Sequence, residues 1–145
     1  MEYIEKMPQL ILTLHVACNG FEDMVWRDIQ VCNNISMHRL AQIILGSLNI
    51  EDLSNYTIVS VGEKFTDCER RGIRTSDSKK FTMADLYMDK GETFLLEAGC
   101  HEFNVKIVAA TDTQSVDTSD YPKVLDKSKG SLADAQRLID MEFPD

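Results

Sequence analysis

Near the start of the chain, two segments alternate between apolar and polar residues. Residues 9–18 read QLILTLHVAC and residues 24–31 read MVWRDIQV, and this period of two predicts half-buried strands. The Asn19-Gly20 pair between them supplies the positive φ that a turn needs. We therefore expect the two strands to form a hairpin.

The second strand carries the only tryptophan of the chain, Trp26, on its less apolar side. Val25, Arg27, Ile29 and Val31 share one face of this strand, and Met24, Trp26, Asp28 and Gln30 share the other. Either Trp26 packs on the less apolar face, under the terminal segment, or a β-bulge brings it to the core. The first placement makes the tryptophan available to a ligand, and the second makes it a core anchor.

From residue 37 the apolar period becomes that of a helix. Apolar residues fall at i, i+3, i+4, i+7, i+8 and i+11, the spacing of a core-facing helical stripe: Met37, Leu40, Ala41, Ile44, Leu45 and Leu48. Ser36 is a suitable N-cap, because its hydroxyl can accept hydrogen bonds from the first-turn amides. The pattern predicts a helix over residues 37–48, followed by a strand over residues 56–61.

The second half of the chain mixes polar stretches with short apolar elements. Residues 62–80 are polar and charged, which predicts a long loop or a loose hairpin, and Thr82 with Asp85 predicts one or two capped helical turns. Ser131 and Asp134 form a similar capping pair. The remaining predicted elements are strands over 93–98 and 101–110 that form a second hairpin, a linker or mobile loop over 111–120, and a helix over 131–143.

This order of elements predicts an α+β fold. One mainly antiparallel sheet is expected to pack on one long helix, with a second helix at the C-terminus. A hairpin followed by a helix and returning strands also fits a β-grasp arrangement. We expect one α+β domain over residues 1–130 and a C-terminal helical tail over residues 131–145, packed on the domain or trailing it.

Composition narrows the functional classes. With 145 residues, 43% of them apolar, the chain can bury a core without a metal or disulfide. Its formal net charge of −9 disfavours nonspecific binding to nucleic acid. The four cysteines form no C-x-x-C pair, the N-terminus lacks the basic start of a signal peptide, and no apolar run is long enough to span a membrane. We expect a cytoplasmic protein with no membrane partner.

Three stretches of the sequence resemble a known family. They are MVWRDIQV followed by ISMHRLAQIILGSL, then FTMADLYMDKGETFLLEAG, and finally YPKVLD. Over about residues 9–130 the chain is similar to the plasmid pRiA4b ORF-three-like family, some of whose members are labelled as transposon-resolvase-like passengers. The resemblance implies a compact α+β domain carried by plasmids and other mobile elements, without a defined activity, and it makes Trp26 a marker of the fold.

The chain departs from this family at two places. Residues 98–103 read AGCHEF where many relatives have a Phe-Gly-Asp-x-Trp turn. The segment DKSKGSLADAQ replaces the Cys- and Gly-rich tail of relatives. Any function that those missing residues carry elsewhere does not transfer to this chain.

Our preferred hypothesis is a small, acidic, non-enzymatic protein-interaction module. Its candidate contact residues are Trp26, Arg27, Glu22, Asp23 and Asp28, with further carboxylates at Asp112, Asp117 and Asp120. Such a surface suits a basic protein partner, and a sharper version is an inhibitor that occupies the nucleic-acid site of a host or defence protein. The simpler interpretation is that these charges only keep the protein soluble.

Two alternatives come from other functional classes. A DNA-binding accessory or regulatory protein would use the basic loop over residues 70–80, with Arg70, Arg71, Arg74, Lys79 and Lys80, although this loop has no aromatic residue to stack a base. A thiol enzyme would use Cys100 and His101, because a neighbouring imidazole can activate a cysteine. Side chains of adjacent residues usually diverge, however, and no third orienting group is evident.

The sequence contains no recognisable motif for binding a metal or a cofactor. His15, His38 and His101 lack the i, i+4 spacing of a helical zinc site, so a site would have to assemble from distant segments. We therefore expect neither a metal nor a cofactor.

Overall fold

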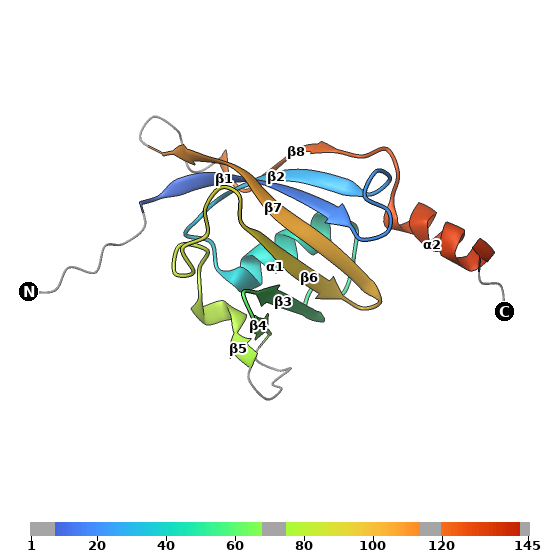
Figure 1. Ribbon diagram of the computed structural model, residues 1–145, viewed down its shortest axis with the longest axis horizontal. Helices are drawn as coiled ribbons and strands as arrows, with labels where there is room; N and C mark the ends of the chain where they lie inside the picture. Colours follow the sequence, from blue (N-terminus) through green and yellow to red (C-terminus); the bar gives the residue numbers. More distant parts are fainter. Residues whose placement is uncertain (1–7, 68–74, 114–119, 143–145) are drawn as a thin grey trace, which may run out of the picture.

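The computed structural model describes residues 8–67, 75–113 and 120–142, and in these residues the chain forms eight strands and two α-helices (Figure 1). They are β1 (Leu10–Cys18), β2 (Trp26–Cys32), α1 (Met37–Ser47), β3 (Tyr56–Ser60), β4 (Glu63–Thr66), β5 (Thr75–Asp77), β6 (Thr93–Ala98), β7 (His101–Asp112), β8 (Lys123–Lys127) and α2 (Leu132–Glu142). A short 3-10 helix, Ser78–Lys80, follows β5.

The strands form one mixed sheet in the order β5-β4-β3-β6-β7-β1-β2-β8. Only β4 and β5 run parallel, and the other neighbours are antiparallel. The prediction of a β-grasp fold is wrong. The hairpin β6–β7 returns the chain so that β7 meets β1 antiparallel, and the first hairpin is enclosed on its other side by β8.

The helix α1 packs on one face of this sheet (Figure 1). The Ser36 hydroxyl accepts a hydrogen bond from the Arg39 amide at 3.0 Å, which confirms the predicted N-cap. The predicted stripe is buried at Met37, Leu40, Ala41, Ile44 and Leu45. Calling this the one long helix of the fold was wrong, because α1 and α2 both have eleven residues.

The core lies between α1 and the sheet. Its strand residues alternate with more exposed neighbours, as the period of two predicts. They include Leu12, Leu14 and Val16 of β1, Ile29 and Val31 of β2, Tyr56 and Ile58 of β3, Phe65 of β4, Phe94 and Leu96 of β6, and Phe103, Val105 and Ile107 of β7.

The polar stretch after β3 contains more regular structure than the sequence predicted. Ser60 pairs with Glu63, so the connection is a two-residue turn at Val61 and Gly62, both of which have positive φ. This geometry joins β3 to β4 as a tight hairpin and places Phe65 in the core. No Asn-Gly pair marks this turn, and the strand predicted over residues 56–61 ends at Ser60, because Val61 is the first residue of the turn.

Two capping pairs were predicted correctly. The Thr82 amide donates to Asp85 Oδ2 at 2.9 Å and the Asp85 amide to Thr82 Oγ1 at 3.0 Å, in a turn rather than a regular helix. The Ser131 amide donates to Asp134 Oδ2 at 2.9 Å and lowers the pKa of that carboxyl. The predicted hairpin of β6 and β7 is also present, but β8 was not predicted. Most of the predicted linker, residues 114–119, lies outside the described residues.

Candidate functional site

Trp26 and Arg27 lie on opposite faces of β2. Arg27 is only 4% exposed and points into the layer between the sheet and α1, where it donates to the Ser47 carbonyl. Trp26 is half-buried on the other face, beside His15. No bulge brings the tryptophan into the core, so the prediction that it lies on the less apolar face of β2 is correct, whereas its cover by the terminal segment stays a prediction.

A histidine and an aspartate lie beside Trp26 on the same face of the sheet. His15 and Asp28 are directly opposite each other in the β1–β2 hairpin, and His15 Nδ1 lies 2.6 Å from Asp28 Oδ1. The centre of the His15 ring lies 5.7 Å from that of Trp26. These side chains therefore form one connected group. The sequence predicted the hairpin and its faces but not its register, which the structure supplies and which aligns His15 with Asp28.

The residues around this group form a continuous surface, which we call the open face. Cross-strand pairing places Lys106 beside His15, Thr93 beside Lys106, Asn104 beside Ala17, and Leu95 between Asn104 and Val59. The open face comprises His15, Trp26, Asp28, Val59, Thr93, Leu95, Asn104 and Lys106, all of them half-buried or exposed. In Figure 1, α1 lies on the opposite side of the sheet and α2 lies beyond the β1–β2 turn, so neither helix covers it.

Arg27 instead joins three segments beneath the sheet. Its Nε donates to the Ser47 carbonyl at 2.9 Å, and its Nη1 donates to the Trp26 carbonyl at 2.7 Å and to Ser128 Oγ at 3.1 Å. Burial lowers the pKa of its guanidinium. Helix α1 has no basic residue in its last turn, so Arg27 supplies the positive charge that favours a helix C-terminus. The predicted contact surface that combined Arg27 with Trp26 is therefore wrong.

Only some of the acidic residues predicted to contact a partner are exposed in the described part of the chain. Glu22 and Asp23 are exposed in the β1–β2 turn, where Glu22 Oε1 accepts from the Gly20 amide at 3.0 Å. Asp28 is engaged by His15. Asp112 and Asp120 are exposed, whereas Asp117 lies outside the described residues.

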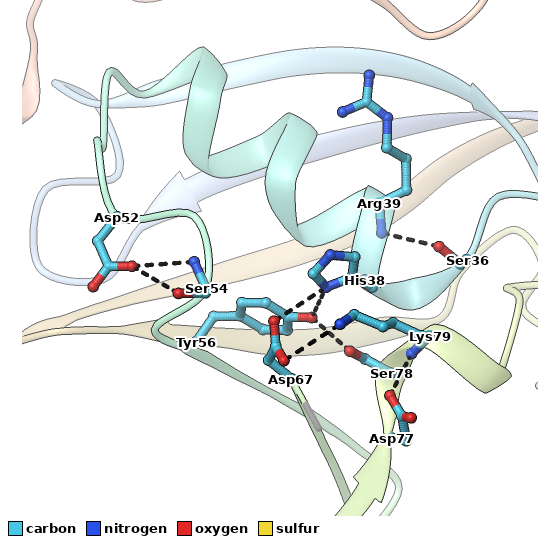
Figure 2. Close-up of polar contacts among 10 residues, drawn as sticks. All are labelled: Ser36, His38, Arg39, Asp52, Ser54, Tyr56, Asp67, Asp77, Ser78 and Lys79. Carbon is cyan, nitrogen blue, oxygen red and sulfur yellow. Dashed lines mark hydrogen bonds and ion pairs between the residues drawn. The ribbon is translucent and has the colours of Figure 1, made fainter. Parts of the chain in front are cut away.

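Sequence reasoning missed a polar cluster beneath the other end of the sheet (Figure 2). Hydrogen bonds join the Tyr56 hydroxyl to His38 Nδ1 at 2.7 Å and to Ser78 Oγ at 2.5 Å. Asp67 Oδ2 lies 3.9 Å from His38 Nδ1, and Lys79 Nζ lies 3.6 Å from Asp67 Oδ1. The five residues come from α1, β3, the end of β4 and the 3-10 helix, so no local motif reveals them.

The side chains of this cluster are of the types that form proton relays, but its central residues are buried like those of a structural hydrogen-bond network. Tyr56 and Ser78 are fully buried. Burial raises the pKa of the Tyr56 hydroxyl, with Asp67 adding to the rise and the Ser78 hydrogen bond opposing it. Because its central hydroxyls have no exposed surface for a substrate, the cluster serves to tie α1 to the sheet and to the 3-10 helix.

The predicted basic loop is described only at its end. Arg70, Arg71 and Arg74 lie outside the described residues. Lys79 is half-exposed and paired with Asp67, and Lys80 is exposed. The described part therefore brings one lysine into the polar cluster and leaves the second at the surface.

Comparison with protein families matches residues 10–135 to the plasmid pRiA4b ORF-3-like protein family. The chain belongs to this family. Among solved structures, it is similar to a protein of unknown function from Methanosarcina mazei Go1, with 16% sequence identity and a TM-score of 0.68, over 92% of this chain and 82% of that chain. At this identity the likeness shows the fold alone. No curated protein matches the chain significantly.

In this member of the pRiA4b ORF-3-like family, the AGCHEF segment forms the β6–β7 turn. Cys100 is exposed there, and a cavity of about 200 Å³ is lined by Cys100, His101, Asp52 and Asn55, among others. Asp52 Oδ1 accepts from the amide and hydroxyl of Ser54 at 3.2 and 3.1 Å. Within the described chain, no hydrogen bond links His101 to Cys100 or Asp52, so the arrangement lacks an oriented base.

Among the described residues of this family member, we next consider the buried thiol and the side chains that could bind a metal ion. Cys18 is buried, and burial raises the pKa of its thiol, with Glu22 and Cys100 adding to the rise. Across the three described ranges, no group of three or more His, Cys, Asp or Glu side chains is arranged to hold a metal ion. Neither described helix is long and apolar enough to cross a membrane.

Proposed function

We propose that this protein is a non-enzymatic protein-interaction module that binds its partner on the open face, with Trp26 as the main contact residue. The observation that carries the proposal is the position of Trp26, which is half-exposed on a sheet face that neither helix covers. Tryptophan is enriched among the residues that dominate binding energy at protein interfaces.

The local structure favours binding at low entropic cost. Trp26 stands on a strand paired on both sides, and the adjacent His15 ring and its contact with Asp28 restrict the space around it. A side chain held in this way loses little freedom when a partner docks. Leu95 and Val59 extend the same row with apolar surface, so the open face has the mixture of aromatic, apolar and polar groups found in transient interfaces.

The charges around Trp26 favour a basic partner. Glu22 and Asp23 are exposed in the turn that leads into β2, and the whole chain carries a formal net charge of −9. We propose a nucleic-acid-binding protein of the host or its defence system, which this protein inhibits by occupying its basic surface. Its membership of a plasmid-related family supports a mobile genetic element as the setting. Within the described residues, neither Lys79 and Lys80 nor the Cys100–His101 turn offers a comparable surface.

Affinity capture from a lysate of the organism that carries the gene tests this proposal. The wild type is expected to retain a partner whose binding weakens with salt, and Trp26→Ala is expected to lose about tenfold or more in affinity. Tyr87→Ala is the matched control, because Tyr87 is 56% exposed and lies outside the open face. Circular dichroism verifies that both variants fold. Equal retention by wild type and Trp26→Ala, or no salt-sensitive partner, would overturn the proposal.

A further inference from the structure

The guanidinium of Arg27 is buried without a matching carboxylate. Its three hydrogen bonds end on two carbonyls and one hydroxyl, all neutral, and none of the ion pairs among the described residues includes it. The partial negative charge at the α1 C-terminus offsets only about half of a unit charge. A buried cation normally has a full counter-ion, so the arrangement leaves room for an anion.

The unused donors of Arg27 face a cavity. An arginine has five N–H groups, and the hydrogen bonds above use Nε and Nη1 but leave Nη2. No buried side-chain nitrogen or oxygen among the described residues lacks a partner, so Nη2 must reach an accessible surface. Arg27 lines a cavity of about 460 Å³ between the end of α1 and β8, a volume within the usual range of small-ligand sites.

The other walls of this cavity define the ligand chemistry. Lys127 is directly opposite Arg27 in the β2–β8 pairing and lines the same cavity. Val124 and Leu125 contribute apolar surface, and they are 47% and 48% exposed. Asp126, whose carboxylate accepts a hydrogen bond from the Lys127 amide at 2.8 Å, and Ser47 complete the lining. Two cations against one carboxylate suit a ligand with a single negative charge, and the apolar residues suit a short hydrocarbon group beside it.

We propose that this cavity binds a small organic carboxylate, with the carboxylate on Arg27 Nη2 and Lys127 and its apolar group against Val124 and Leu125. This site lies under β8, on the side of the sheet opposite the open face, and is independent of the proposed partner surface. The carboxylate comes either from a free acid or from the C-terminus of a peptide, because both present the same planar group to the guanidinium.

Titration of the ¹⁵N-labelled full chain, followed by nuclear magnetic resonance, tests the proposal with defined probes. 4-Methylpentanoate is expected to shift the amide signals of Ser47 and Val124–Lys127 saturably. 4-Methylpentanamide, which has the same shape without the charge, is expected to bind about tenfold more weakly or less. N-acetyl-alanyl-leucine distinguishes the two sources of the carboxylate. If the site takes the C-terminus of a peptide, this peptide binds more tightly than 4-methylpentanoate, and its C-terminally amidated form does not.

Charge variants of the exposed lining residues test the site without removing Arg27. Lys127→Gln is expected to weaken 4-methylpentanoate binding about threefold, and Asp126→Asn to strengthen it about threefold. Lys90→Gln is the control, because Lys90 is exposed and distant in sequence from the lining. The proposal is overturned if no saturable shift occurs, if the amide or inorganic phosphate binds as well as the acid, or if Asp126→Asn and Lys127→Gln leave binding unchanged.

Discussion

Trp26 and Arg27 are consecutive residues of β2, yet they belong to two different regions of the molecule. Arg27 is 4% exposed and joins β2 to the end of α1 and to Ser128. Trp26 faces outward beside the His15–Asp28 pair. The covered face is built from many mutually dependent contacts, whereas the open face is built from cross-strand pairs that involve two or three side chains. Polar character alone therefore does not indicate which side of a strand is available to a partner.

The largest expected difference between the two faces comes from neighbouring truncations in β2. Ile29 is fully buried, so Ile29→Ala leaves a cavity and is expected to cost about 4 kcal/mol of unfolding free energy. Gln30→Ala removes a hydrogen bond to Thr13 on the other face, and we expect a loss of at most about 1 kcal/mol. Urea unfolding measures both values, and similar losses would contradict the division into two faces.

Removing the buried cation tests whether Arg27 belongs to the structure of the covered face. Arg27→Leu leaves the Ser47 and Trp26 carbonyls and the Ser128 hydroxyl without their donor, so we expect a loss of about 3 kcal/mol in chemical unfolding. Arg39→Leu is the control, because Arg39 is exposed on α1 and should change stability by less than about 0.5 kcal/mol. A loss as small as that of the control would show that water replaces the guanidinium.

The Tyr56 cluster makes the covered face sensitive to alkaline pH. Tyr56→Phe is expected to cost about 1.5 kcal/mol at neutral pH, because His38 and Ser78 lose a buried partner. The pKa of Tyr56 is raised in the folded state, so its stabilisation is complete below the unfolded pKa of about 10 and is lost as pH rises through the folded pKa.

Stability curves of the wild type and Tyr56→Phe should therefore converge above about pH 10. Tyr87→Phe provides the comparison, since Tyr87 is largely exposed. Parallel curves for the wild type and Tyr56→Phe across this range would contradict the assigned pKa shift.

The smallest effect is expected on the open face. His15 and Asp28 are 42% and 32% exposed in their side chains, so solvent screens their attraction. A double-mutant cycle with His15→Ala and Asp28→Ala should give a coupling of about 0.5 kcal/mol, smaller at high salt. A coupling above about 2 kcal/mol would indicate that this pair contributes to the fold as strongly as the buried groups.

Sequence patterns correctly predicted the elements that depend on residues near one another in the chain. The stripe from Met37 to Leu45, the Ser36 and Ser131 caps and the two predicted hairpins each depend on residues close together in the chain. Strand β8 has no such signal, because all of its five residues are exposed and its strand conformation depends on pairing with β2. The turn at Val61 and Gly62 was not predicted for a related reason, since valine seldom adopts the positive φ that it has here.

The candidate site was predictable only where strand pairing determines it. The register of the first hairpin aligns His15 with Asp28, and alternation places Trp26 on their side. The partners of Arg27 are separated from it by 20 and 101 positions, and Tyr56 is separated from His38 and Ser78 by 18 and 22. Such contacts follow from the packing of distant segments, which no spacing rule in one sequence reveals.

The enclosed position of the first hairpin has a consequence for biosynthesis. Of the described strands, β1 and β2 are translated before the others, but their outer neighbours in the sheet are β7 and β8, which come after all the others. Neither edge of the nascent hairpin can therefore pair until most of the chain has been translated. The hydrogen bond from Arg27 to Ser128 forms later still. Pairing between such distant segments slows folding and leaves strand edges exposed to aggregation. Until β8 is translated, the outer edge of β2 therefore has no strand to pair with.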